Sequence, residues 1–130
     1  RYNLSDQVLI KDNHIAAVGS IEKAVEMVRK SVGKTMKIEV EVETKEEFLE
    51  ALGTSADIIM LDNMNNELMK ELVEINNHSK KIEASGNMEL KRVRSVALLG
   101  VDYISVGALT HSYKSLDISL KFYKNFPRSK

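Results

Sequence analysis

The sequence of 130 residues has no cysteine, no tryptophan, a single proline and no net charge. The absence of cysteine excludes disulfides and thiolate chemistry and is typical of the cytoplasm, which is the location we expect. Because 19 basic residues balance 19 acidic ones, the chain lacks the positive field of a nucleic-acid-binding protein, and we expect no nucleic-acid partner. No apolar run approaches the roughly 20 residues that span a membrane, so we expect no membrane partner either.

Short segments rich in aliphatic and β-branched residues alternate with amphipathic segments along the chain. The former predict strands over residues 7–11, 37–43, 56–62, 81–85 and 102–107. Between them, apolar residues recur at the spacing of helices. The predicted helix starts are Ser20, Thr44 (in a capping box with Glu47), Asn65 or Asn66, and Asn87, and the last helix is expected to stop at Gly100. Strand and helix in alternation predict right-handed βαβ units on a parallel sheet.

Two architectures fit this order, an open doubly wound sheet and part of a (β/α) barrel. In segment 37–43 the residues alternate, so that one face carries Ile38, Val40 and Val42 and the other carries Glu39, Glu41 and Glu43. A parallel strand with helices on both sides should be apolar on both faces. Segment 81–85 has the same polar face, which favours a barrel whose lumen holds these groups, with Lys11 and Lys81 compensating the acids. The alternative is an edge strand with solvated glutamates.

The number of strands is too small for a closed barrel. A complete barrel of this type needs about 250 residues and eight strands. We therefore predict an α/β fold in which alternating β–α units form an incomplete TIM-like barrel with about five parallel strands. The sequence also begins with "RYNLSD" rather than with a methionine, so we expect it to be the C-terminal part of a longer protein.

Polar residues follow every predicted strand, and each has an ordinary explanation as a turn, a helix cap or a solvated side chain. Because the carboxyl ends of parallel strands meet at one edge, the groups would also converge there. Glycine beside serine in two turns predicts an anion site, and Glu41 and Asp62 on neighbouring strands could bind Mg²⁺ or sugar hydroxyls. Lys11 would attract an anionic substrate. Together these groups indicate a sugar phosphate.

Several motifs resemble the C-terminal region of quinolinate phosphoribosyltransferase, also called nicotinate-nucleotide pyrophosphorylase (carboxylating). They are "LSDQVLIKDNHI", "IEVEVE", "DIIMLDNM", "EASGN" and "GVDYISVGALTHSYKSLDISLKF", which cover almost the whole chain in order. The resemblance implies an enzyme of de novo NAD synthesis that joins quinolinate to phosphoribosyl pyrophosphate. The products are nicotinate mononucleotide, pyrophosphate and carbon dioxide.

The resemblance also implies the domain organisation and the cofactor. Residues 1–130 would form the C-terminal part of an α/β barrel with an incomplete strand ring, without the N-terminal sandwich domain and the first barrel strands. Mg²⁺ would be required with phosphoribosyl pyrophosphate, with no organic cofactor. The whole protein would be a homodimer or higher homo-oligomer with shared active sites, and we expect the 130 residues alone to be inactive and to self-associate.

The resemblance assigns roles to individual residues. Arg1 and Lys11 would bind quinolinate, and Lys11, Glu41 and Asp62 would be catalytic. Glu41 and Asp62 would also contact the ribose and pyrophosphate and hold Mg²⁺, directly or through water. The phosphate turns would comprise Ser85, Gly86, Asn87, Ser105, Gly107 and Ala108, with Asn87 standing where many members have glycine.

Three assignments stay open at this point. His111 lies in a family motif, and a structural loop histidine explains it equally well. The chain could also belong to a related pyrophosphorylase-like barrel with another substrate. It could instead be a non-catalytic half-barrel that binds phosphate.

Overall fold

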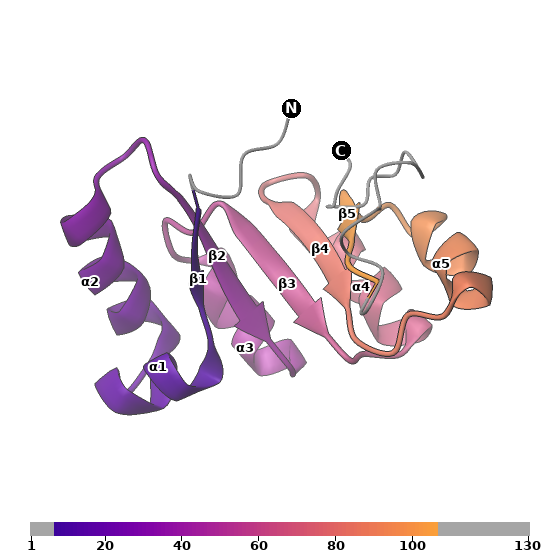
Figure 1. Cartoon of the computed structure of the whole chain (residues 1–130), viewed down its shortest axis with the longest axis horizontal. Coiled ribbons are helices and arrows are strands. Elements are labelled where there is room, and N and C mark those ends of the chain that lie inside the picture. Colours follow the sequence, from indigo (N-terminus) through magenta and orange to yellow (C-terminus); the bar gives the residue numbers. More distant parts are fainter. Residues whose placement is uncertain (1–6, 107–130) are drawn as a thin grey trace.

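Five short strands form one parallel sheet in the order β1-β2-β3-β4-β5 (Figure 1). The computed structural model describes residues 7–106. The strands are β1 (Gln7–Ile10), β2 (Lys37–Val42), β3 (Ile58–Asp62), β4 (Lys81–Ser85) and β5 (Tyr103–Ile104). Each strand lies within the range predicted for it, and each pairs in parallel with the next strand along the chain. The prediction of a parallel sheet with five strands is confirmed.

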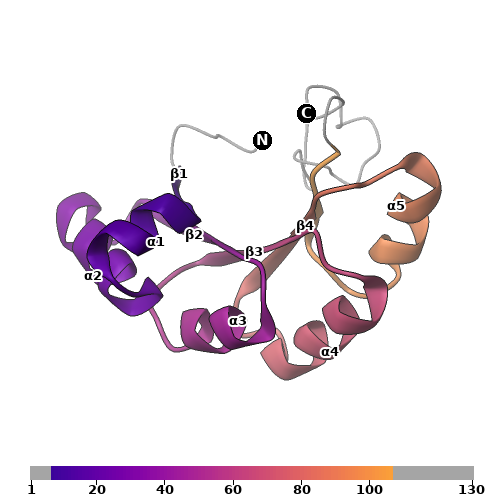
Figure 2. The same ribbon diagram turned by 90° about the horizontal axis from the view of Figure 1, so that it is seen from below.

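The helices cover the outer side of the curved sheet, as Figure 2 shows. They are α1 (Asp12–Val18), α2 (Ile21–Val32), α3 (Lys45–Leu52), α4 (Asn66–Asn76) and α5 (Leu90–Ala97). A doubly wound sheet reverses its strand order and carries helices on both faces. Sequential strands with helices on one side are instead the arrangement of a barrel wall, and β1 and β5 are its two edges within the described residues. The barrel interpretation is therefore confirmed against the open sheet.

Three predicted helix starts are present as side-chain caps. The side-chain oxygens of Ser20, Thr44 and Asn65 each accept the N–H three residues later, at 3.1, 3.1 and 2.8 Å. The capping box differs in one bond, because the carboxylate of Glu47 accepts from the N–H of Glu43 (2.7 Å) rather than from that of Thr44. These caps stabilise the first turns of α2, α3 and α4.

The predicted start of the last helix is wrong. Asn87 does not cap it, since α5 begins at Leu90 after Glu89. The helix ends at Ala97, and Gly100, where the stop was predicted, has a left-handed φ of +99° three residues later. Asn87 has a φ of +45°, which belongs to a left-handed turn and cannot start a helix. The turn after β4 is therefore longer than predicted.

A helix that the sequence pattern did not predict follows β1 directly. Asp12, Asn13 and His14, which follow the strand predicted over residues 7–11, form the first turn of α1. Nδ1 of His14 accepts the N–H of Lys11 at 3.4 Å, and Gly19 ends the helix at a φ of +104°. Ile15 and Val18 of α1 are partly buried against the core, so the apolar residues at helical spacing extend over a single turn.

The two faces of the sheet differ as predicted. The face toward the helices is apolar and buried and includes Ile10, Ile38, Val40, Val42, Ile59, Leu61, Ile82, Ala84 and Ile104. On the inner face Glu39 and Glu83 are also buried, at 4% and 1% exposure. Nε2 of Gln7 donates to Oε1 of Glu39 at 2.9 Å, and the hydroxyl of Ser105 donates to Oε2 of Glu83. Such hydrogen bonds offset the cost of burying carboxylates.

The prediction that Lys81 compensates the acids of the lumen is wrong. Lys81 is the first residue of β4, so it lies at the amino end of the sheet, beside Ile58. Its ammonium group is exposed and lies 4.0 Å from Oδ1 of Asp102.

Two aspartates fix the strand starts by the same device. Oδ2 of Asp57 accepts the N–H of Ile38 at 2.9 Å, while its own N–H donates to the carbonyl of Ile38 at 2.8 Å. Asp102 makes the same two bonds to Ile82, also at 2.9 and 2.8 Å. Asp57 precedes β3 and binds the start of β2, whereas Asp102 precedes β5 and binds the start of β4. Each aspartate bracket, as we call this pair of hydrogen bonds from one aspartate to one residue of the neighbouring strand, fixes the register of one strand pair.

The helices within residues 7–106 are too short or too polar for any of them to cross a membrane.

Candidate active site

The structure brings together three residues that the sequence predicted as catalytic. Lys11 follows β1, Glu41 lies near the end of β2, and Asp62 is the last residue of β3. The register places Glu41 opposite Met60, so Asp62 lies one pleat further along on the same face. The carboxyl groups of Glu41 and Asp62 are joined by a hydrogen bond, and the charge of Lys11 acts on Glu41.

The carboxyl of Glu41 titrates near neutral pH. Its pKa is raised from 4.5 to about 7, chiefly by burial and then by the hydrogen bond to Asp62 and the charge of Asp62. Lys11 lowers this pKa, and Asp12 raises it. Two carboxyl groups in contact resist losing both protons. A cation placed between them would therefore displace a proton from the pair.

A third carboxylate, that of Glu43, belongs to the same cluster. One carboxylate oxygen each from Glu41, Glu43 and Asp62 lie within 4.8 Å of one another. Carboxylate oxygens are the ligands that Mg²⁺ prefers, usually with several waters kept. The donor set thus fits the expected metal. Glu43 is not among the site residues predicted above, although the alternation of residues in 37–43 places it on the same face as Glu41.

The predicted phosphate turn after β4 rests directly on the loop after β3. The N–H of Asn63 donates to the carbonyl of Ser85 at 2.9 Å. Gly86 has a φ of +89°, and a Cβ there would lie 2.8 Å from the backbone nitrogen of Asn63. Only glycine fits such an approach without displacing backbone. Asn87 adopts a φ of +45°, a left-handed conformation that asparagine tolerates better than most residues.

The second predicted turn is described only at its start. Ser105 directly follows β5, and its N–H donates to the carbonyl of Ala84 at 2.9 Å, which places it beside the end of β4. Its hydroxyl is bound to Glu83. Arg1, Gly107, Ala108 and His111 lie outside the described residues.

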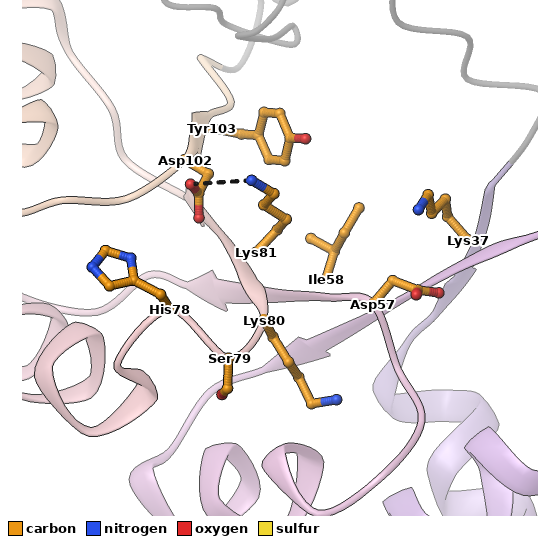
Figure 3. A pocket seen from close by; sticks show the side chains of 9 residues that line it. All are labelled: Lys37, Asp57, Ile58, His78, Ser79, Lys80, Lys81, Asp102 and Tyr103. Atoms are coloured by element: carbon orange, nitrogen blue, oxygen red, sulfur yellow. Dashed lines mark ion pairs between the residues drawn. The ribbon is translucent and has the colours of Figure 1, made fainter.

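A hollow of about 270 Å³ lies at the opposite, amino end of the strands (Figure 3). Two of its charged groups, Asp57 and Asp102, fix strand starts through the backbone of Ile38 and Ile82. Asp57 is bound by the guanidinium of Arg29 at 2.9 Å, and Asp102 lies near Lys81. Nζ of Lys80 donates to the carbonyls of Thr54 and Ala56 at 2.7 and 2.6 Å. We place the functional site at the carboxyl ends, where barrel proteins bind their ligands.

A parallel barrel wall with acids and a tight glycine turn at its carboxyl edge defines the chain as part of a ligand-binding α/β barrel protein. The family model described as "Quinolinate phosphoribosyl transferase, C-terminal domain" matches residues 1–121. The chain belongs to this family.

Relatives from several lineages agree with this membership. A probable nicotinate-nucleotide pyrophosphorylase (carboxylating) of Bacillus subtilis is 45% identical over 120 residues, which cover 92% of this chain and 42% of the relative. A quinolinate phosphoribosyltransferase (decarboxylating) of Nicotiana tabacum is 45% identical over 139 residues, covering 93% and 40%. The crystal structure of NadC from Streptococcus pyogenes superposes with a TM-score of 0.77 at 43% identity, covering 86% of this chain and 39% of that one. The chain thus spans about two fifths of the length of these proteins.

Proposed function

We propose that the protein containing this chain is a pentosyltransferase that transfers the phosphoribosyl group of phosphoribosyl pyrophosphate to quinolinate. The reaction forms nicotinate mononucleotide and releases pyrophosphate and carbon dioxide. The observation that carries the proposal is the cluster of Lys11, Glu41 and Asp62 beside the turn at Ser85 and Gly86. The names of the relatives from Bacillus subtilis and Nicotiana tabacum support the same activity.

The two ends of the site take different parts of the substrates. Lys11 and, from outside the described residues, Arg1 bind the carboxylates of quinolinate. Glu41 and Asp62 face the ribose, whose anomeric carbon gains positive charge as pyrophosphate leaves. Carboxylates already fixed beside that carbon stabilise the charge without reorganisation. Once the ring nitrogen is ribosylated, its positive charge stabilises the electron pair that stays on the adjacent ring carbon as carbon dioxide leaves, and that carbon then takes up a proton from the solvent.

The phosphate of the ribose binds at the turns. The first comprises Ser85, Gly86 and Asn87; the second is the one predicted at Ser105, Gly107 and Ala108, of which the structure describes Ser105. Backbone N–H groups in tight glycine turns and at helix starts are suited to phosphate oxygens. The contact between Gly86 and Asn63 holds the first turn against the loop that follows Asp62, so phosphate and ribose can be bound at the same time.

Mg²⁺ would be held by Glu41 and Asp62, with Glu43 as a further ligand, directly or through water. When bound, the ion neutralises the negative charge of the pyrophosphate group. The cytoplasmic location and the assembly into a homodimer or larger oligomer stay predictions.

The test uses the complete protein, with both substrates varied separately. Asp62→Asn keeps the shape and removes the charge, so kcat should fall on the order of 10²-fold or more. Lys11→Ala removes the cation that faces quinolinate, so KM for quinolinate should rise first. Glu74→Gln and Lys30→Ala make the same charge changes at exposed positions of α4 and α2 and should leave both constants unchanged.

Two outcomes would contradict the proposal. Wild-type protein that releases no pyrophosphate with quinolinate, but does so with another pyridine carboxylate, would assign a different acceptor. A folded Asp62→Asn variant with normal kcat would remove Asp62 from the reaction.

A further inference from the structure

Arg92, in the first turn of α5, binds two loops at once. Its Nη2 donates to the carbonyl of Met64, and its Nε donates to Oδ1 of Asn66 at 3.2 Å; both acceptors follow β3. Its Nη1 donates to the carbonyl of Asn87, after β4, at 3.3 Å. The guanidinium group therefore spans the gap between the loop that carries Asp62 and the predicted phosphate turn.

A second set of hydrogen bonds supports this bridge. Nδ2 of Asn66 donates to the hydroxyl of Ser95 at 3.0 Å, and that hydroxyl donates to the carbonyl of Arg92 at 2.9 Å. Asn66 is the first residue of α4, so the starts of the neighbouring helices α4 and α5 are connected through side chains (Figure 2). A planar guanidinium with acceptors in three directions has one orientation, which makes the bridge rigid.

The loops joined by Arg92 are also in direct backbone contact. Gly86 leaves no room for a Cβ against Asn63, and the N–H of Asn63 is bound to Ser85. A shift of either loop therefore displaces the other. Because Arg92 belongs to α5, its hydrogen bonds hold both loops from the helix side of the sheet.

We propose that Arg92 is a positioning residue for phosphoribosyl pyrophosphate. It fixes the Ser85–Asn87 turn relative to the carboxylate of Asp62, so that phosphate and ribose are bound in one geometry, and it acts through these groups rather than on the substrate. The inference rests on the proposed phosphoribosyl transfer. Lys11, which faces quinolinate, follows β1 and is not connected by these bonds, so the effect should be confined to one substrate.

The test measures KM for each substrate in the complete protein with Arg92→Ala and Arg92→Lys. Loss of the bridge should raise KM for phosphoribosyl pyrophosphate about ten- to a hundredfold, because small misplacements of binding groups have effects of this size. KM for quinolinate should stay within about twofold. Lysine keeps the charge but cannot reach three separate acceptors, so Arg92→Lys should resemble Arg92→Ala. Asn66→Ala, which removes one acceptor, should shift the same constant less.

Arg94→Ala is the matched control, since Arg94 is exposed on the same helix and carries the same charge. Full recovery with Arg92→Lys would mean that charge attraction, not positioning, is responsible, and would overturn the inference. A lower melting temperature with both KM values unchanged would make Arg92 purely structural and would also overturn it. If the wild-type protein lacks the transferase activity, the proposed function fails. If the wild-type protein is active and the Arg92→Ala variant has the same KM values, only the role of Arg92 is refuted.

Discussion

Gly86→Ala should destabilise the chain by two separable effects. The φ of +89° is a left-handed conformation that costs an L-residue about 1–2 kcal/mol. The new Cβ would also lie 2.8 and 2.9 Å from the backbone nitrogen and Cα of Asn63, which cannot rotate away. Overpacking against such a rigid neighbour typically costs about 1–3 kcal/mol. The sum is about 2–5 kcal/mol, which corresponds to a decrease in Tm on the order of 10 °C.

Gly19→Ala isolates the conformational part of this loss. Gly19 has a similar φ of +104°, but nothing lies within 4 Å of its would-be Cβ. Denaturant unfolding of the wild type and both variants gives the two free energies by linear extrapolation. The difference between the variants, about 1–3 kcal/mol, measures the contact with Asn63. Equal losses at Gly86 and Gly19 would refute the argument that the two loops are in close contact.

Three further predictions concern charge and assembly. The pKa of Glu41 is raised to about 7, so the folded chain keeps a proton that the unfolded chain loses above about pH 4.5. The free energy of unfolding should therefore fall as the pH rises from 4.5 through 7. Asp62→Asn should therefore stabilise the chain at pH 8 by about 1 kcal/mol, with solvent screening included, and change its stability little at pH 5. An equal gain in stability at pH 5 and pH 8 would contradict this. Burial raises the pKa of Asp57, but the N–H of Ile38 and the guanidinium of Arg29 outweigh it and hold that pKa below 3.8. Asp57→Asn should cost about 1–2 kcal/mol at neutral pH, and the loss should shrink as the pH falls below 3.8, as acid titrations of both proteins would reveal. The isolated 130 residues should self-associate through their open sheet edges, and a monomer at about 1 mM in sedimentation would speak against this.

The strands were predictable because side chains alternate between two chemically different faces. In β2 the alternation of valine and glutamate identifies both the strand and the lumen side. Helix starts with a local polar cap, such as Ser20 and Thr44, were predictable for the same reason: the signal and the structure lie within a few residues.

The remaining features depend on contacts that the sequence does not display. The helix α1 contacts the core through Ile15 and Val18, and one such pair at helical spacing is too short to indicate a helix. Lys81 was misplaced because its charge indicates a partner but not the end of the sheet at which the partner lies. Arg92 binds a carbonyl 28 residues away, and no residue type marks a carbonyl as an acceptor.

The aspartate brackets at the strand starts decide how accurately the acids at the other edge are placed. A slip of one residue between β2 and β3 would shift Glu41 against Asp62 by about 3.3 Å and turn alternate side chains to the opposite face. Asp57 prevents that slip by binding both backbone groups of Ile38. A shift in register at the amino edge of the sheet would therefore displace the carboxylates at the other edge by the same distance. A screen of random variants for lost activity should find Asp57 among its sensitive positions, although its side chain lies at the far end of the strand from any substrate.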